Sequence, residues 1–134
     1  MKKLILIAGF IGFTSLFAQE NNKVVQKKSY YDSGEIKTDK FEMNNGEVKM
    51  VWYYKNGNIR ETGFFKNGLK HGLWTQFSEN GQKTAQAYYE KGAKEGTWSF
   101  WNTDGNLVYQ LDFNKNVKLG AKHWDNEGKL IAKQ

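Results

Sequence analysis

The 134-residue chain contains no cysteine and no proline. Without cysteine it can form neither disulfides nor thiolate metal sites, and it offers no thiol nucleophile and no cysteine for N-terminal lipid modification. The sequence has two histidines and a single arginine. So few imidazoles leave little material for metal binding or acid–base catalysis. One arginine is also too few for a nucleic-acid interface, although the formal charge is +6.

Long apolar runs are equally scarce, and the longest is Leu4–Phe17. It is shorter than the roughly 20 residues that a membrane-spanning helix needs. Lys2 and Lys3 precede the run and Ala18 follows it, so residues 1–18 are typical of a cleaved signal peptide. A retained anchor is the alternative. We expect export to the periplasm or the cell exterior, without lipidation and without an integral membrane segment after cleavage.

Aromatic residues and glycines are abundant and recur at a fixed interval. An aromatic residue stands four positions before a glycine five times, at a spacing of 23 or 24 residues. The pairs are Tyr30 and Gly34, Tyr53 and Gly57, Phe77 and Gly81, Trp101 and Gly105, and Trp124 and Gly128. A fixed period indicates a repeat array in which each unit packs on its neighbours.

A second series of turn positions lies 11 residues after three of these glycines, at Gly68, Gly92 and Asn116, with Gly46 one residue later than expected. The first series contains Asn-Gly and Asp-Gly dipeptides, which predict tight hairpin turns with positive φ at both central residues. The second series is expected to form longer turns at the opposite end of the strands. The fold predicted is all-β, an elongated, twisted antiparallel meander of about ten strands. We expect residues 19–29 to be a flexible leader or irregular first strand and residues 30–134 to form the repeat domain.

Two ladders of large apolar residues follow the period. One consists of Met43, Phe65, Tyr89 and Phe113, and the other of Trp52, Trp74 and Trp98, with Lys122 at its end. The first predicts a stacked core. We expect the two ladders to lie on different faces, one buried and one partly open.

The segment 63–81 resembles a MORN repeat. It has an aromatic pair, a Lys-Asn-Gly turn, His71 followed by glycine, and alternating aromatics before a final glycine. Residues 88–105 repeat the pattern with Glu95 in place of His71, and residues 109–128 are a more degenerate copy. The resemblance implies stacked β-hairpins and is closest to the bacterial YwqK-type antitoxin group. It also implies scaffolding of proteins or association with lipid head groups.

Catalytic groups do not converge in the sequence. His71 and His123 are predicted to lie along one sheet edge about two repeats, or roughly 20 Å, apart, too far to share a metal. The closest carboxylate pairs all fall in or beside turns, where such residues commonly serve hydrogen bonding. They are Asp32 with Glu35, Glu79 with Glu95, and Asp125 with Glu127. We expect no catalytic, cofactor-binding or metal-binding residues.

A surface is the better functional candidate. The candidate binding residues are Trp52, Trp74, Trp98, Lys70, His71, Lys94 and Lys118, in which the charged members form a basic rim. The sequence predicts an exported, non-catalytic module that binds or scaffolds another protein. Two alternatives are an envelope-associated binder of anionic lipid or cell-wall glycan, and an antitoxin or immunity protein. No nucleic-acid partner is expected.

Overall fold

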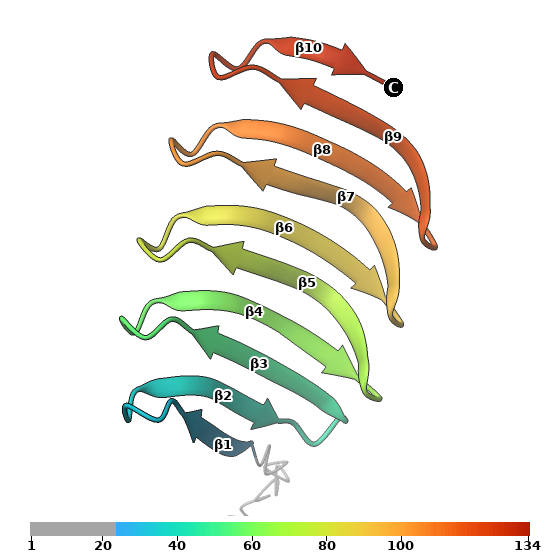
Figure 1. Ribbon diagram of the computed structural model, residues 1–134. Helices are drawn as coiled ribbons and strands as arrows, with labels where there is room; N and C mark the ends of the chain where they lie inside the picture. The colour runs from blue at the N-terminus through green and yellow to red at the C-terminus, as the bar shows by residue number, and fades with distance from the viewer. Residues whose placement is uncertain (1–23) are drawn as a thin grey trace, which may run out of the picture.

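The computed structural model describes residues 24–134, which form one antiparallel sheet whose ten strands follow one another in sequence order (Figure 1). The strands are β1 (Val25–Tyr30), β2 (Ile36–Glu42), β3 (Glu47–Tyr53), β4 (Ile59–Lys66), β5 (Leu69–Phe77), β6 (Lys83–Glu90), β7 (Ala93–Trp101), β8 (Leu107–Asn114), β9 (Val117–Trp124) and β10 (Leu130–Lys133). The predicted ten-strand meander is thus confirmed. The proposed signal peptide and residues 19–23 lie outside the described residues, and β1 begins within the segment expected to be a leader.

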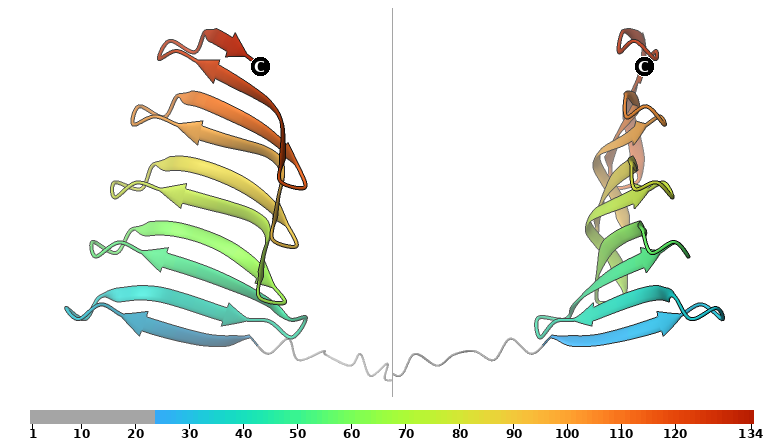
Figure 2. Two further views of the ribbon diagram at one scale, coloured as in Figure 1. Left: turned by 45° about the vertical axis from the view of Figure 1, so that its right-hand side comes forward. Right: turned by 90° about the vertical axis from the view of Figure 1, so that its left-hand side faces the viewer.

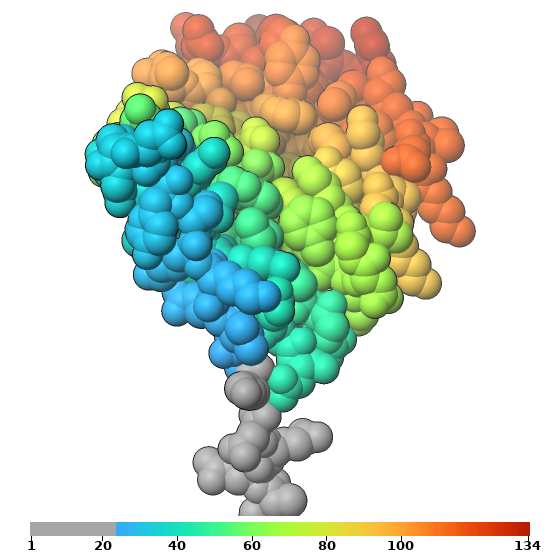
Figure 3. Space-filling view, turned by 60° about the horizontal axis from the view of Figure 1, so that its bottom comes forward, coloured from blue at the N-terminus to red at the C-terminus, as the bar shows by residue number. Residues whose placement is uncertain are grey.

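The sheet is a single, elongated layer. Seen edge-on it is thin and twisted, and its strands bend near one end (Figure 2). In the space-filling view, successive strands follow one another as bands (Figure 3). β1 and β10 form the two outer edges. Residues 24–134 contain no helix with the length and hydropathy of a membrane span.

The turns that join β1 to β2, β3 to β4 and so on lie together at one end of the strands (Figure 1). Between β3 and β4, the Gly57 amide donates to the Tyr54 carbonyl at 3.0 Å and the Tyr54 amide donates to the Asn58 carbonyl at 2.8 Å. Gly57 has φ of +87°, whereas Asn56 is not among the residues with positive φ. This pattern is a type I turn followed by a glycine bulge. The expectation of two positive φ values at these dipeptides is therefore wrong.

The two-residue turns lie at the other end of the strands. Lys66 pairs directly with Leu69, and the two residues between them, Asn67 and Gly68, have φ of 51° and 76°. Lys91–Gly92 and Lys115–Asn116 repeat this arrangement. The prediction that this series would be longer is wrong, because the tightest turns occur here. The expected left-handed conformation of Asn116 is confirmed at φ 72°.

Strands β5 and β7 each contain a bulge just after the two-residue turn. The β4–β5 register shifts between Thr62 and Phe64, where Gly72 of β5 adopts φ of 69°. Gly96 does the same in β7 with φ of 64°. Bulges bend and twist the strand that carries them, and here they coincide with the bend of the sheet.

The bulge in β9 contains one extra residue, whereas those in β5 and β7 contain two. Asp112 pairs with Gly120 and Phe113 with Lys118, so Leu119 is a single extra residue. One extra residue reverses the alternation of the strand. Ala121 therefore stands opposite Leu111 in the row of Trp98, and Lys122, which pairs with Gln110, lies on the other face. The prediction that Lys122 ends the tryptophan ladder is wrong.

Hydrogen bonds outside the strand ladder also join turns to neighbouring repeats. The side-chain amides of Asn56 and Asn58 donate to the Glu79 carbonyl at 2.8 and 2.7 Å. At the opposite end, the Gly92 amide donates to the Lys70 carbonyl at 2.8 Å. These contacts fix the position of one hairpin on another beyond the strand ladder itself.

Candidate binding surface

Six aromatic rings form one continuous row on one face of the sheet, which we call the aromatic row. Its members are Trp52, Phe65, Trp74, Tyr89, Trp98 and Phe113. Trp52 and Phe65 both contact Trp74, and the contacts continue through Tyr89 and Trp98 to Phe113, with the contacting ring centroids 5.1 to 6.1 Å apart. These are ordinary distances for aromatic pairs. The two ladders predicted from the sequence therefore interdigitate on a single face, and the expectation that they occupy different faces is wrong.

Trp74 is the centre of this row and is 4% exposed. Its indole lies directly on Gly63, where an added Cβ would stand 2.3 Å from Cδ2. The indole N–H donates to the Phe64 carbonyl at 3.1 Å, beside the bulge. Trp98 makes the equivalent bond to the Tyr88 carbonyl, also at 3.1 Å, but it faces Ala87 and is more exposed. Because Gly63 has no side chain and the bulge exposes the Phe64 carbonyl, the Trp74 indole packs directly against the backbone of the sheet.

Burial on this face remains shallow. The buried apolar residues are Val51, Trp74 and Phe113, of which Val51 belongs to the opposite face, and no side chain among residues 24–134 is completely buried. Burial raises the pKa of the Tyr89 hydroxyl, with a smaller contribution from the Glu61 carboxylate. The tyrosine therefore stays neutral over a wider pH range than an exposed one. The aromatic row is therefore a hydrophobic cluster that is covered by the sheet on one side and partly exposed to solvent on the other.

Three lysines, Lys70, Lys94 and Lys118, accompany the aromatic row, and we call them the lysine row. Each lies directly opposite a ring of the aromatic row in the strand register, namely Phe65, Tyr89 and Phe113. The Lys70 ammonium stands 3.8 Å from the Trp74 ring centroid and 5.0 Å from that of Tyr89. The Lys94 ammonium lies 5.0 Å from the Trp98 centroid and 5.1 Å from that of Phe113. Two of the lysines expected on an open rim therefore lie over the rings.

A hollow of about 410 Å³ opens at the β2–β4 end of the aromatic row. Val48, Met50, Trp52 and Phe65 supply most of its wall, and Lys40 stands at its border. Lys40 is already paired, since its ammonium lies 2.7 Å from the Glu42 carboxylate. The volume falls within the range of small-ligand and side-chain pockets.

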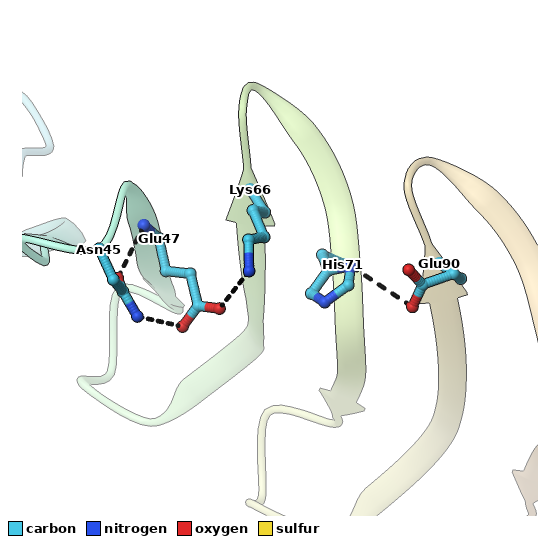
Figure 4. Close-up of polar contacts among 5 residues, drawn as sticks. All are labelled: Asn45, Glu47, Lys66, His71 and Glu90. Carbon is cyan, nitrogen blue, oxygen red and sulfur yellow. Dashed lines mark hydrogen bonds and ion pairs between the residues drawn. The ribbon is translucent and has the colours of Figure 1, made fainter.

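His71 does not belong to this surface. It pairs with Phe64, one residue away from the Phe65–Lys70 pair, and so points to the other face of the sheet. Its Nδ1 lies 3.6 Å from the Glu90 carboxylate (Figure 4). Of the residues predicted to form one binding surface, the three tryptophans and three lysines gather together and His71 does not.

Figure 4 also shows the contacts of the Glu47 carboxylate, which lies beside the turn between β2 and β3. Glu47 accepts a hydrogen bond from the Asn45 side-chain amide at 3.1 Å and another from the Lys66 ammonium at 3.4 Å. These two bonds, the first being the larger effect, lower the pKa of the Glu47 carboxyl. Lys66 is thus held by an acid, unlike the lysine row.

The face opposite the aromatic row, which we call the polar face, carries a line of polar residues across the strands. Thr62, Thr75, Gln86, Ser99 and Gln110 follow one another across its strands. Phe64, Leu73 and Tyr88 also lie on this face, and Leu73 and Tyr88 are exposed. Among residues 24–134, however, no series of ring contacts like the aromatic row forms there, so we regard the polar face as the less favourable surface for a partner.

The residues considered for chemistry are dispersed. His71 lies near the start of β5 and His123 near the end of β9, so the expectation of a shared edge is wrong. They also lie on opposite faces, because the single extra residue in β9 reverses its alternation. The His123 ring stacks on Tyr109 with centroids 4.1 Å apart. In the described part of the chain, no three acidic or imidazole side chains converge as a metal site would require.

The carboxylate pairs show the same dispersion. Glu79 belongs to the turn after β5, whereas Glu95 lies near the opposite end of the strands, in β7. The Asp125 carboxylate accepts hydrogen bonds from the Glu127 and Lys129 amides at 3.0 and 2.9 Å. It therefore stabilises a turn. In the Asp32–Glu35 turn, a hydrogen bond with the Ser33 side chain is the main cause that lowers the pKa of Glu35. Glu79 and Glu95 are therefore too far apart to act as an acid–base pair, and Glu35 and Asp125 take part in the hydrogen bonds of their turns.

Comparison with protein families places these features in a known repeat. The family model described as MORN repeat variant matches residues 46–67, 70–91 and 94–115. Each match begins within or beside a turn at the bending end of the sheet and covers two strands. This model describes a repeat module, not an enzyme. A comparison with curated proteins finds no match.

Proposed function

We propose that this chain, a MORN repeat variant protein with three matched repeats, is a non-catalytic protein-binding module whose contact surface is the aromatic row. The observation that carries the proposal is the meeting of six rings and three cations on one face of a single-layer sheet. The lysines of the lysine row form no ion pair with a carboxylate among residues 24–134. Their charge is therefore available to a partner.

Aromatic side chains supply large contact area at low entropic cost, which is why tryptophan and tyrosine are frequent at interface hot spots. In a globular domain such a row would be covered by a second layer. Here the sheet has one layer, so a bound partner would complete the core. Partner binding would bury the open sides of Trp52 and Trp98 and would stabilise the sheet.

We also propose export, on the basis of the leader-like residues 1–18. Mass spectrometry of the protein recovered from the bacterial envelope and medium tests this, because cleavage after Ala18 gives a defined N-terminus at Gln19. An intact Met1 in the recovered protein would contradict it. Immunity toward an exported toxin would be a special case of protein binding.

The protein-binding proposal is tested with two matched double variants. Lys70→Glu with Lys94→Glu reverses charge on the aromatic face, and Lys49→Glu with Lys122→Glu makes the same net change on the polar face. Cross-linking and affinity capture from envelope extract should yield a stoichiometric protein with wild type and with the polar-face variant. Loss of that protein only in the aromatic-face variant supports the proposal. Equal capture by both variants would refute the assignment of the surface.

An anionic lipid or cell-wall glycan is the second candidate, because the unpaired lysine row favours any anionic surface. Attraction between exposed charges is screened over about 8 Å at physiological salt. Sedimentation with anionic vesicles or cell-wall fragments that disappears as salt is raised, and that requires the lysine row, would favour this candidate.

A further inference from the structure

We infer that the segment recognised is an extended acidic peptide in the polyproline II conformation, which crosses the strands and sets a carboxylate on each member of the lysine row. This inference rests on the proposed protein-binding function and specifies its partner. It depends on the spacing of the lysine row, on the rings between its members and on the hollow at the end of the aromatic row.

The lysine row is evenly spaced by the fold. Lys70, Lys94 and Lys118 occupy the same position in β5, β7 and β9, so one intervening strand separates each from the next. Strands in a sheet lie about 4.8 Å apart, which gives a cation roughly every 9.6 Å along a line perpendicular to the strands. A ligand that satisfies all three must carry anions with a similar period on one side.

Peptide conformations differ in this period. A polyproline II helix has three residues per turn and rises about 3.1 Å per residue, so every third side chain returns to one side after about 9.3 Å. A β-strand places every second side chain on one side, about 6.7 Å apart. An α-helix returns after seven residues, or about 10.5 Å. Lys70 and Lys118 are two intervals, or about 19.2 Å, apart. Two polyproline II periods fall short of this length by about 0.6 Å, and two seven-residue helical periods exceed it by about 1.8 Å.

The rings between the lysines suit the same ligand. Polyproline II segments are recognised by grooves lined with aromatic side chains, because their conformation is formed before binding and their rings pack flat on other rings. Tyr89 and Phe113 stand between and beside the cations, and their contacts with Lys70 and Lys94 hold the ammonium groups on the face. Lys70 and Lys94 are therefore positioned before the ligand arrives, whereas Lys118 has only its place in the strand register.

The hollow beside Trp52 and Phe65 fixes where the ligand begins. It lies at the β2–β4 end, next to Lys70 in β5, and its wall is largely apolar. An aromatic or aliphatic side chain about one turn before the first carboxylate would enter it. The Glu61 carboxylate on the same face accepts a hydrogen bond from the Gln76 side chain at 3.3 Å and has no ion pair with Lys70 among the described residues.

The test uses the full chain and synthetic peptides. The probe is Phe-Pro-Pro-Glu-Pro-Pro-Glu-Pro-Pro-Glu, compared with a scrambled peptide whose three glutamates are consecutive and with a helical peptide that carries glutamate at every seventh position. Titration calorimetry measures affinity, and the fluorescence of the tryptophans in the row reports occupancy. We expect the probe to bind at least tenfold more tightly than either comparison peptide.

Substitutions of single lysines test which glutamate of the probe lies on which member of the lysine row. Lys94→Gln should weaken the probe about fivefold (about 1 kcal/mol), and Lys49→Gln on the polar face should have no effect. Shortening the probe by its last Pro-Pro-Glu should remove the effect of Lys118→Gln and keep that of Lys70→Gln. Circular dichroism confirms that each variant is folded.

The outcomes separate this inference from the proposed function. Equal binding of the scrambled peptide, or tighter binding of the helical one, overturns the inference while leaving a protein partner captured through the aromatic row unaffected. Binding of an acidic oligosaccharide with the same lysine dependence, in the absence of peptide binding, also overturns it. If charge reversal on the aromatic face fails to change capture of the natural partner, the proposed function itself fails.

Discussion

The contact between Gly63 and Trp74 provides the most direct test of how the aromatic row is built. A Cβ at position 63 would lie 2.3 Å from Cδ2 and 2.4 Å from Cε2 of the indole. Gly63→Ala therefore forces the indole outward or the strand backward, and overpacking of this kind costs about 1–3 kcal/mol. Alanine also stabilises the folded protein by about 0.5–1 kcal/mol relative to glycine, because it lowers the conformational entropy of the unfolded chain. The net expected loss of unfolding free energy is therefore between about 0 and 2.5 kcal/mol, with a central value of about 1 kcal/mol.

The measurement is a double-mutant cycle in urea. Trp74→Ala removes the indole, and in that background Gly63→Ala should become neutral or stabilising, since nothing then opposes the methyl group. Ala87→Gly is the control, because Ala87 stands one 24-residue period after Gly63, opposite the β7 bulge that carries Trp98, and pairs with Trp74 on its other side; removal of its methyl group frees space without creating a clash. Near-ultraviolet dichroism should show a displaced tryptophan only in Gly63→Ala. An equal loss in both Trp74 backgrounds would refute the packing explanation.

Three further predictions concern the turns and the charges. Gly105→Val should lower the unfolding free energy by about 1–2 kcal/mol, because valine is strained at φ 83°; an unchanged urea midpoint would contradict this. Lys91→Gly should raise the unfolding free energy by about 0.5–1 kcal/mol, since Lys91 has φ of 49° in a turn that suits glycine; a lowered melting temperature would contradict it. Glu47 has a folded-state pKa below its unfolded value of 4.5, so its stabilising contribution is present above that pH and is lost as pH falls through the folded pKa. Glu47→Gln should flatten the acid side of the stability profile, and an unchanged profile would count against the Asn45 and Lys66 bonds.

The period of the sequence was sufficient to predict the sheet. Glycines such as Gly57 and Gly81 recur with the strands, and each has the positive φ that a turn requires. The turn types could not be assigned in the same way. Asn56–Gly57 is compatible both with a two-residue turn and with a type I turn plus bulge, and the number of residues between paired strands decides between them. That number depends on strand register, which a dipeptide does not report.

The wrong turn length predicted at Asn67–Gly68 also explains why the two ladders were predicted to lie on different faces of the sheet. Once Asn67 and Gly68 are known to form a two-residue turn, Phe65 must face the same way as Lys70, and alternation then carries Trp74 to that face as well. The grouping of the tryptophans with the lysines was predicted as a surface, but their contacts were not. The position of His123 was missed because the single extra residue in β9 has no distinctive sequence signal.

The strictly sequential order of the strands has a consequence for size. Because each hairpin touches the hairpins before and after it, removing or duplicating one 24-residue period leaves every remaining junction of the same kind. The fold sets no natural upper length and requires no closure between its ends. An array of this type can therefore act as a molecular ruler, in which gene duplication adjusts the length of chain it measures without redesigning any single contact.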